Sequence, residues 1–305
     1  MIRFIFLYLF IIIGVHSSPA QSALDKNDSV IKYSPVKFKG YFNLLGNDLK
    51  EQLIAPLNMN NKQIFHFGLF TCATVALIFA DPKVDAFARK SRNESSVVSS
   101  ASPIITNFGA TYAFYTVGAL ELSGLVFRDK KLIVSGLLAT QAMITSGLFT
   151  RVGKIIFGRE RPSAAYETNT YNRGGKWHGA PDFFKNWIDS KSVPGAGYDA
   201  FPSGHTSMAF SIATVYATMY KDHLAVPIIA YSVASLVGLS RLTEHAHWSS
   251  DIFVGAALGY LCGKQVVKNY WKLNHIEPSQ RKHKNISLSL NYSEKTYFAG
   301  MNCFF

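Results

Sequence analysis

The stretch Ser240-Arg241-Leu-Thr-Glu-His245-Ala-His247-Trp-Ser-Ser-Asp251 is a polar passage between two apolar segments. His247 and Asp251 are four residues apart, so on a helix their side chains share one face. The carboxylate can then hold one ring nitrogen protonated and leave the other free for nucleophilic attack. Arg241 places a cation at the end of an apolar segment, which is costly unless an anion pairs with it. The stretch predicts an anion site where one helix ends and the next begins.

Two further clusters precede it, Lys154-Ile-Ile-Phe-Gly-Arg159-Glu-Arg161-Pro162 and Phe201-Pro202-Ser203-Gly204-His205. Guanidinium and ammonium groups suit phosphate, and carboxylates near these cations are few, so an anionic ligand is the expected partner. The second cluster opens a helix, whose free N–H groups and positive dipole end bind anions. Each cluster alone has a structural explanation, as a helix cap or a snorkelling cation. Their order and spacing together indicate one phosphate site.

The surrounding sequence predicts an all-α fold. Six apolar segments have the length and the Ala, Leu, Ile, Val and Met content of helices rather than strands. In an up-down bundle, the ends that carry the three clusters lie on one side. The dipeptide Asp81-Pro82 is expected to end the first segment. The six segments are about 64–80, 103–127, 132–150, 205–220, 224–240 and 250–267.

The three clusters resemble a known signature. Lys-x6-Arg-Pro (154–162), Pro-Ser-Gly-His (202–205) and Ser-Arg-x5-His-x3-Asp (240–251) are similar to the tripartite motif of the type-2 phosphatidic acid phosphatase superfamily. That superfamily also contains bacterial class A acid phosphatases and vanadium haloperoxidases. The match has no departure at the motif positions and covers roughly 64–267. It implies a six-helix bundle with a phosphate or vanadate pocket, and it leaves the substrate open.

The resemblance also implies a role for each matching residue. His247 is the expected nucleophile, Asp251 its orienting carboxylate, and His205 the acid that protonates the leaving oxygen and then activates water. With three cations in the pocket, no metal or other cofactor is expected. His245 and Arg159 flank the motifs and are given no catalytic role. The groups expected to hold the phosphate oxygens are Lys154, Arg161, Ser203, the Gly204 N–H and Arg241.

The N-terminus predicts export. Met1-Ile2-Arg3, an apolar run over 4–15 and small residues after it have the order of a secretory signal peptide, assigned to 1–23. An uncleaved N-terminal anchor is the alternative. Residues 24–63 are predicted to be an irregular arm with a short helix near 47–54.

Two segments outside the clusters have their own character. Residues 163–200 are polar, rich in glycine and aromatic side chains, and join the first two clusters, so a lid or substrate-recognition loop is predicted. Residues 271–305 read as a basic linker and a C-terminal β-hairpin, because apolar and polar residues alternate over 286–293. A single hairpin cannot close an outer-membrane barrel, so packing on the helical body is the favoured interpretation.

Composition limits the classes of protein. The chain has 305 residues, 48% hydrophobic and 16% charged, which excludes a disordered chain, and its three cysteines exclude a small disulfide scaffold. The net charge is +12, from 31 Lys and Arg against 19 Asp and Glu. These basic residues are scattered and form no recognisable nucleic-acid module, so membrane and phosphate are the expected partners.

Membrane topology is left open by the sequence. If a signal peptide exports the chain and every apolar segment crosses the bilayer, the first cluster returns to the cytoplasm. Three solutions remain: one segment does not cross, with 64–80 the weakest candidate; the run 4–15 is itself the first crossing; or no segment crosses and the bundle is periplasmic.

The leading functional prediction is a phosphatase of the cell envelope. It acts on a lipid-linked phosphate or pyrophosphate through a phosphohistidine, with its site facing the periplasm. The first alternative is a soluble periplasmic acid phosphatase of broad specificity. A vanadium haloperoxidase and a non-enzymatic membrane protein with a relic anion site are the further alternatives.

Overall fold

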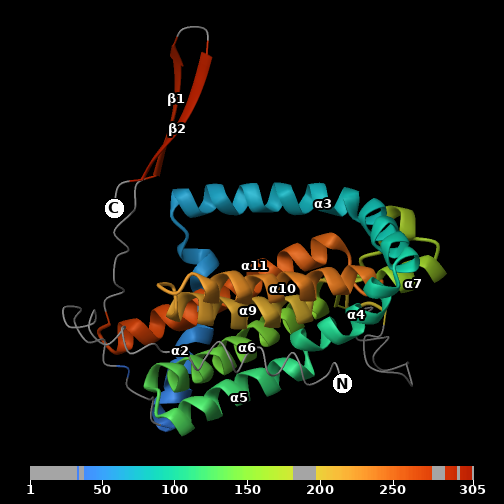
Figure 1. Ribbon diagram of the computed structural model, residues 1–305. Coiled ribbons are helices and arrows are strands. Elements are labelled where there is room, and N and C mark those ends of the chain that lie inside the picture. The colour runs from blue at the N-terminus through green and yellow to red at the C-terminus, as the bar shows by residue number, and fades with distance from the viewer. Residues whose placement is uncertain (1–32, 34–37, 181–196, 277–285, 294–295, 304–305) are drawn as a thin grey trace. The chain divides into compact units, whose positions relative to one another are not determined.

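The computed structural model describes residues 33, 38–180, 197–276, 286–293 and 296–303 (Figure 1). The chain divides into two compact units, Met1–Tyr270 and Trp271–Phe305. The predicted signal peptide and much of the arm that follows it lie outside the described residues.

The described part of the chain contains nine α-helices, so the prediction of six was wrong. The expected arm contains a 17-residue helix, longer than the one predicted near 47–54, and a short helix occurs in the loop after the first cluster. The helices are α2 (Phe38–Ile54), α3 (Asn61–Glu94), α4 (Ser96–Thr106), α5 (Thr111–Phe127), α6 (Lys130–Phe157), α7 (Pro162–Glu167), α9 (Gly204–Met219), α10 (Ala225–Thr243) and α11 (Ser249–Leu273).

The first apolar segment does not end at Asp81-Pro82, because α3 continues through Pro82 to Glu94. The reason is tertiary. Asp81 is fully buried, and its carboxylate accepts hydrogen bonds from the Ser249 hydroxyl (2.5 Å) and the Ser250 main-chain N–H (2.9 Å). These bonds to the start of α11 hold the helix beyond the proline, where the missing N–H is otherwise a strong stop signal.

The second apolar segment is two helices instead of one. The short 3-10 helix η3 (Asn107–Gly109) separates α4 from α5, and the two axes are bent by 57°. A Cβ added to Gly109 would lie 2.6 Å from Val237 Cγ1 and 2.7 Å from the carbonyl oxygen of His205. The break therefore lets the backbone touch both α10 and the first turn of α9.

A row of glycines sets the packing of α11 on α9. Gly255, Gly259 and Gly263 are four residues apart on one face of α11, and a Cβ added to any of them would overlap the main chain at Ser203, Ser207 or Ser211. The absence of side chains lets the two helices approach closely. Figure 1 shows α9, α10 and α11 side by side, with α6 along the other side of α9.

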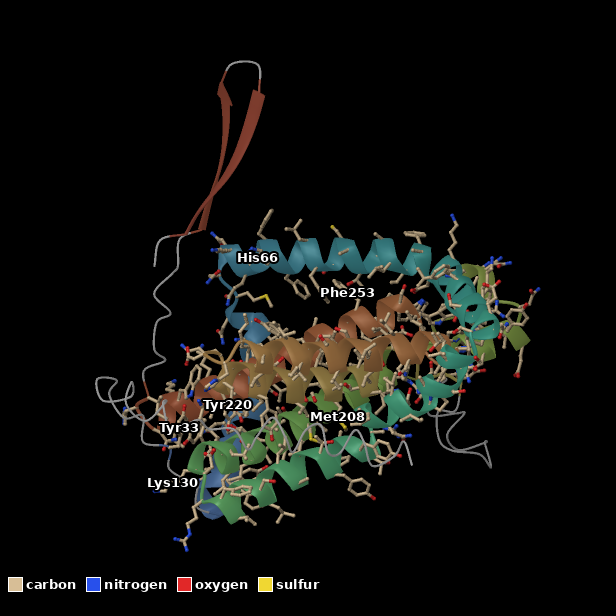
Figure 2. The ribbon with its side chains drawn as sticks, in the orientation of Figure 1. Tyr33, His66, Lys130, Met208, Tyr220 and Phe253 are labelled. Carbon is tan, nitrogen blue, oxygen red and sulfur yellow. The ribbon has the colours of Figure 1, made fainter. Side chains whose placement is uncertain are left out.

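Within the part of the chain that the structure describes, three helices are long and apolar enough to cross a membrane, namely α3, α6 and α10. The bent pair α4 and α5 adds a fourth if it is counted as one span. The segment 64–80 was expected to be the weakest candidate, but α3 has the highest mean hydropathy of the three, 1.7. Its first turns expose large apolar side chains, including Phe65 and Phe67. On its inner side Phe70 stacks on Phe253 of α11, with ring centroids 4.9 Å apart (Figure 2).

The second unit contains two strands. β1 (Ile286–Ser293) and β2 (Thr296–Cys303) pair antiparallel, with Ile286 opposite Cys303 and Ser293 opposite Thr296.

Candidate active site

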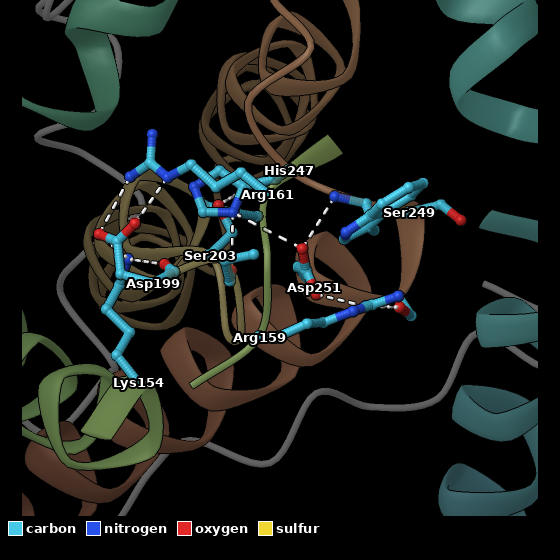
Figure 3. A network of polar contacts seen from close by, with 12 residues as sticks. Lys154, Arg159, Arg161, Asp199, Ser203, His247, Ser249 and Asp251 are labelled. Carbon is cyan, nitrogen blue, oxygen red and sulfur yellow. Dashed lines mark hydrogen bonds and ion pairs between the residues drawn. The ribbon is translucent and has the colours of Figure 1, made fainter. Parts of the chain in front are cut away.

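Four helix ends converge at one end of the helical unit and carry the residues of the three clusters (Figure 3). The main-chain N–H of Ser203 donates to the carbonyl oxygen of Asp251 at 3.0 Å, which joins the starts of α9 and α11. A Cβ added to Gly204 would lie 3.9 Å from Lys154 Cε at the end of α6. The structure thus brings the three clusters to one place, as the bundle hypothesis requires.

His247 is 1% exposed, and its ring is fixed by the main chain. Its Nδ1 lies 2.7 Å from the carbonyl oxygen of Ala200. A carbonyl only accepts hydrogen bonds, so Nδ1 carries the proton and Nε2 carries a free lone pair. Burial, with the charges of Lys154 and Arg161, lowers the pKa of His247 well below its ordinary value. The ring is therefore neutral and nucleophilic at Nε2.

The orienting role predicted for Asp251 differs from what the structure shows. Asp251 Oδ2 is 3.7 Å from His247 Nδ1, beyond hydrogen-bond distance, and it accepts instead from the main-chain N–H of Trp248 at 2.8 Å. The other oxygen accepts from Arg159 at 2.6 Å. Asp251 thus fixes the turn that carries His247, while Ala200 holds the ring.

Arg159 is central to this region, although it was assigned no catalytic role from the sequence. Its guanidinium is fully buried and forms ion pairs with Asp251 (2.6 Å) and Asp81 (2.7 Å), so it links α3 to α11 (Figure 3). It lies between two indole rings, 4.6 Å from the centroid of Trp177 and 5.2 Å from that of Trp248. The only sign of this role in the sequence is that Arg159 stands beside a motif and has no evident carboxylate partner near it.

The carboxylate of Asp199 forms ion pairs with Lys154 and Arg161, two of the three cations expected to bind phosphate. Its carboxylate accepts from Arg161 Nε at 2.6 Å and Nη2 at 3.0 Å, and from Lys154 Nζ at 3.1 Å. Burial raises the pKa of Asp199, but the charges of Lys154 and Arg161 outweigh it and hold the pKa well below its ordinary value. The sequence analysis found few carboxylates near these cations and did not consider Asp199, which is 45 residues from Lys154 and 38 residues from Arg161 in the chain.

The third cation is also paired. Arg241 Nη1 lies 2.5 Å from Glu244 Oε2, a contact within the third cluster itself. Glu244 also accepts from the hydroxyl of Thr106 at 2.7 Å, which ties the pair to α4.

Among the described residues the imidazole of His205 has no hydrogen-bond partner. Burial, together with the charges of Arg241 and Lys154, lowers the pKa of His205 to about 3. The hydroxyl of Ser203 is buried and lies 3.0 Å from the hydroxyl of Thr206. Both histidines therefore face the same cations and are neutral near pH 7.

The segment predicted as a lid, 163–200, is described except for 181–196. Its first part is anchored on Glu160, whose carboxylate accepts from the main-chain N–H of Lys176 and contacts the ring of His178, both at 2.9 Å. Its last part supplies Asp199 and Ala200. The segment therefore contributes directly to the site, while closure over a substrate stays a prediction.

Comparison with known proteins finds a family whose match contains the predicted site residues. The PAP2 superfamily model matches residues 135–275, which include all eight predicted site residues. Over these residues the chain is similar to type-2 phosphatidic acid phosphatases. Within the matched residues, the helices α6, α9, α10 and α11 carry the three clusters.

The relatives of the PAP2 domain include lipid phosphatases. The chain is 38% identical over 78 residues to "Lipid A 1-phosphatase" of Porphyromonas gingivalis, covering 25% of this chain and 17% of the relative. It is 31% identical over 170 residues to "Probable diacylglycerol pyrophosphate phosphatase 1" of Schizosaccharomyces pombe, covering 52% and 59%. The chain thus spans less than two thirds of the length of these relatives.

Two solved structures are similar to this chain. Aquifex aeolicus LpxE aligns with a TM-score of 0.44 and 22% identity, over 62% of this chain and 94% of LpxE. A transmembrane PAP2 type phosphatidylglycerolphosphate phosphatase from Bacillus subtilis aligns with a TM-score of 0.46 and 22% identity, over 80% and 98%.

Proposed function

We propose that this protein is a phosphatase that hydrolyses a lipid-linked phosphate or pyrophosphate through a phosphohistidine intermediate. The observation that carries the proposal is the buried neutral His247, whose Nδ1–H is held by Ala200 and whose Nε2 is left free beside three cations. The names of the relatives support a lipid substrate, and the apolar helices α3, α6 and α10 support a site at a membrane surface.

In the first step Nε2 of His247 attacks phosphorus. The N–P bond forms as the bond from phosphorus to the leaving oxygen breaks, and the leaving oxygen takes a proton from His205. The pKa of His205 is about 3 without substrate. The imidazole can therefore act as an acid only if binding of the substrate raises its pKa. A phosphate dianion offsets the charges of Lys154 and Arg161 and thereby raises the pKa of His205.

In the second step water attacks the phosphohistidine. His205 accepts a proton from the water, the N–P bond breaks, and inorganic phosphate leaves while His247 regains its lone pair. The cations stabilise the charge on the equatorial oxygens in both steps, together with the Gly204 N–H at the start of α9. Asp251 and Arg159 position the nucleophile without touching the substrate.

The test is phosphate release from a panel of lipid phosphates by detergent-purified protein. Activity is expected to persist in EDTA and to fall at least about 10³-fold in His247→Ala. Brief incubation with ³²P-labelled substrate should leave an acid-labile, base-stable label on wild type. Retained turnover in His247→Ala would overturn the mechanism.

Extraction of the protein from membranes distinguishes a membrane enzyme from a soluble acid phosphatase. We infer membrane insertion, because three helices have the length and apolarity of spans. The protein should stay with membranes in alkaline carbonate and high salt and leave them only in detergent.

A further inference from the structure

We propose that a cavity beside the catalytic phosphate site binds a second anionic group on the substrate's head group. The cavity has a volume of about 510 Å³ and lies between the C-terminal part of α3 and the turn from α10 to α11. Three of its lining residues, Arg89, Arg92 and Asn93, come from α3, and Arg241 and Glu244 come from the end of α10. The inference rests on the proposed phosphatase function, because it concerns the same substrate.

The cavity is connected to the reacting phosphate through a shared residue. Arg241 lines it and also belongs to the three cations around His205 and His247. A substrate whose scissile phosphate binds near Arg241 can therefore reach this cavity with a second group of its head group. The three sequence clusters do not indicate this cavity, because α3, which lines it, precedes all of them in the chain.

Both α3 arginines are held in place by contacts of their own. Arg92 Nη1 donates to the carbonyl oxygen of Thr243 at 3.1 Å. The guanidinium of Arg89 lies 5.2 Å from the ring centroid of Tyr166 and 5.3 Å from that of Tyr171. Because these contacts fix the two groups, little side-chain entropy remains to be lost when an anion binds.

The charges around the cavity favour an anion. Arg89 pairs with Asp85 at 3.4 Å, but that buried carboxylate also contacts His245 Nδ1 at 2.8 Å and accepts from the Tyr171 hydroxyl at 2.6 Å. Glu244 pairs with Arg241. Arg92 has one hydrogen bond to a main-chain carbonyl and has no carboxylate partner among the described residues, so its positive charge remains uncompensated.

Guanidinium forks recognise phosphate oxygens, and the Asn93 amide adds a donor at the rim. The ligand class is therefore a head group with two phosphates. The second phosphate is either the neighbour of the scissile one in a pyrophosphate or a separate group farther along a sugar. Both sources present the same chemistry to the arginines, and they differ in the spacing between the two phosphates.

The experiment compares Arg92→Gln with Lys90→Gln. Lys90 lies on the same turn of α3, its side chain is 70% exposed, and its removal changes the charge by the same amount away from the cavity. Each protein is assayed with phosphatidate, with diacylglycerol pyrophosphate and with a bisphosphorylated disaccharide lipid. For Arg92→Gln the KM ratio of a two-phosphate substrate to phosphatidate should rise about tenfold with kcat little changed. Lys90→Gln should leave the ratio unchanged.

The two-phosphate substrate whose KM ratio rises in Arg92→Gln shows which spacing between the two phosphates fits the cavity. An equal effect of Arg92→Gln on all three substrates, or none, would overturn the inference. A second readout does not depend on turnover: inorganic pyrophosphate should stabilise wild type against heat more than phosphate does, and Arg92→Gln should remove this preference. If wild type releases phosphate from no lipid, the proposed function fails, while the thermal shift still decides whether the second anion site exists.

Discussion

Asp199 and Arg161 form a bidentate ion pair, with oxygen–nitrogen distances of 2.6 and 3.0 Å, in the pocket where the cations proposed to bind phosphate meet. The carboxylate therefore sits where the oxygens of a substrate phosphate are expected, and it also contacts Lys154. If this is the phosphate site, as we propose, a substrate has to displace an anion that belongs to the protein, and this competition should lower the affinity for phosphate.

The first prediction is that Asp199→Asn binds phosphate analogues more tightly than wild type. Removing the charge frees Arg161 and Lys154 for the ligand, so the inhibition constant of orthovanadate should fall about tenfold. Competitive inhibition assays measure it. Asp199→Glu, which keeps the charge, serves as the control, and an unchanged or higher inhibition constant in Asp199→Asn would show that Asp199 does not compete.

The second prediction concerns pH and stability. The pKa of His205 falls from 6.5 to about 3 on folding, so between these values the unfolded chain binds more protons and stability drops as pH falls. Between pH 7 and 4.5 wild type should lose about 2–3 kcal/mol more unfolding free energy than His205→Asn. Thermal unfolding in detergent at both pH values tests this, and equal losses would contradict it.

The third prediction is that Arg159→Gln destabilises the protein by about 3–5 kcal/mol, because it leaves Asp81 and Asp251 buried without their cation. Arg173→Gln changes an exposed arginine of the short 3-10 helix η4 (Tyr171–Arg173) and should cost less than about 0.5 kcal/mol. Apparent Tm values in detergent compare the two variants. Similar Tm values for both would mean that the buried network contributes little.

The fourth prediction tests the contact of α11 with α9. The added methyl group in Gly259→Ala overlaps the main chain at Ser207, so the helices have to separate. Stability should fall by about 1–3 kcal/mol, and kcat should fall as His247 and His205 move apart. Gly147→Ala, where nothing lies within 4 Å of the new atom, should be neutral or stabilising by about 0.5–1 kcal/mol. If both variants behave alike, the glycine row does not set the spacing.

The fifth prediction concerns topology. The helices α3, α6 and α10 all end at the site, so if they span the bilayer, residue 58 lies on the opposite face from the site. A periplasmic site then places Asn58 in the cytoplasm. In a background without native cysteines, Asn172→Cys should react with an impermeant thiol reagent in intact cells and Asn58→Cys should not. The reverse pattern would place the site in the cytoplasm.

That last prediction bears on the N-terminus. A cleaved signal peptide would deliver the start of α3 to the periplasm, the same face on which the site is proposed. A periplasmic site therefore requires that the start of α3 stays in the cytoplasm, so the run 4–15 either does not export the chain or crosses the membrane with its N-terminal end outside.

The sequence by itself determined the eight residues of the three clusters, their order and their arrival at one end of a helical bundle. It could do so because these are local signals: an apolar segment that ends at a cation, a proline before a helix start, and a histidine and an aspartate one turn apart. It failed where a partner is distant in the chain. It ended α3 at Asp81-Pro82, missed Asp199 and dismissed Arg159.

Only the tertiary structure decided which buried polar groups pair with one another. Asp81 and Asp251 meet on Arg159 from positions 78 residues before it and 92 residues after it, and neither separation leaves a periodic trace in sequence. The same holds for His247, whose ring is held by a main-chain carbonyl that any residue at position 200 would offer. A buried charge selects its partner by distance in space and by exclusion of water, and both exist only after the helices have packed.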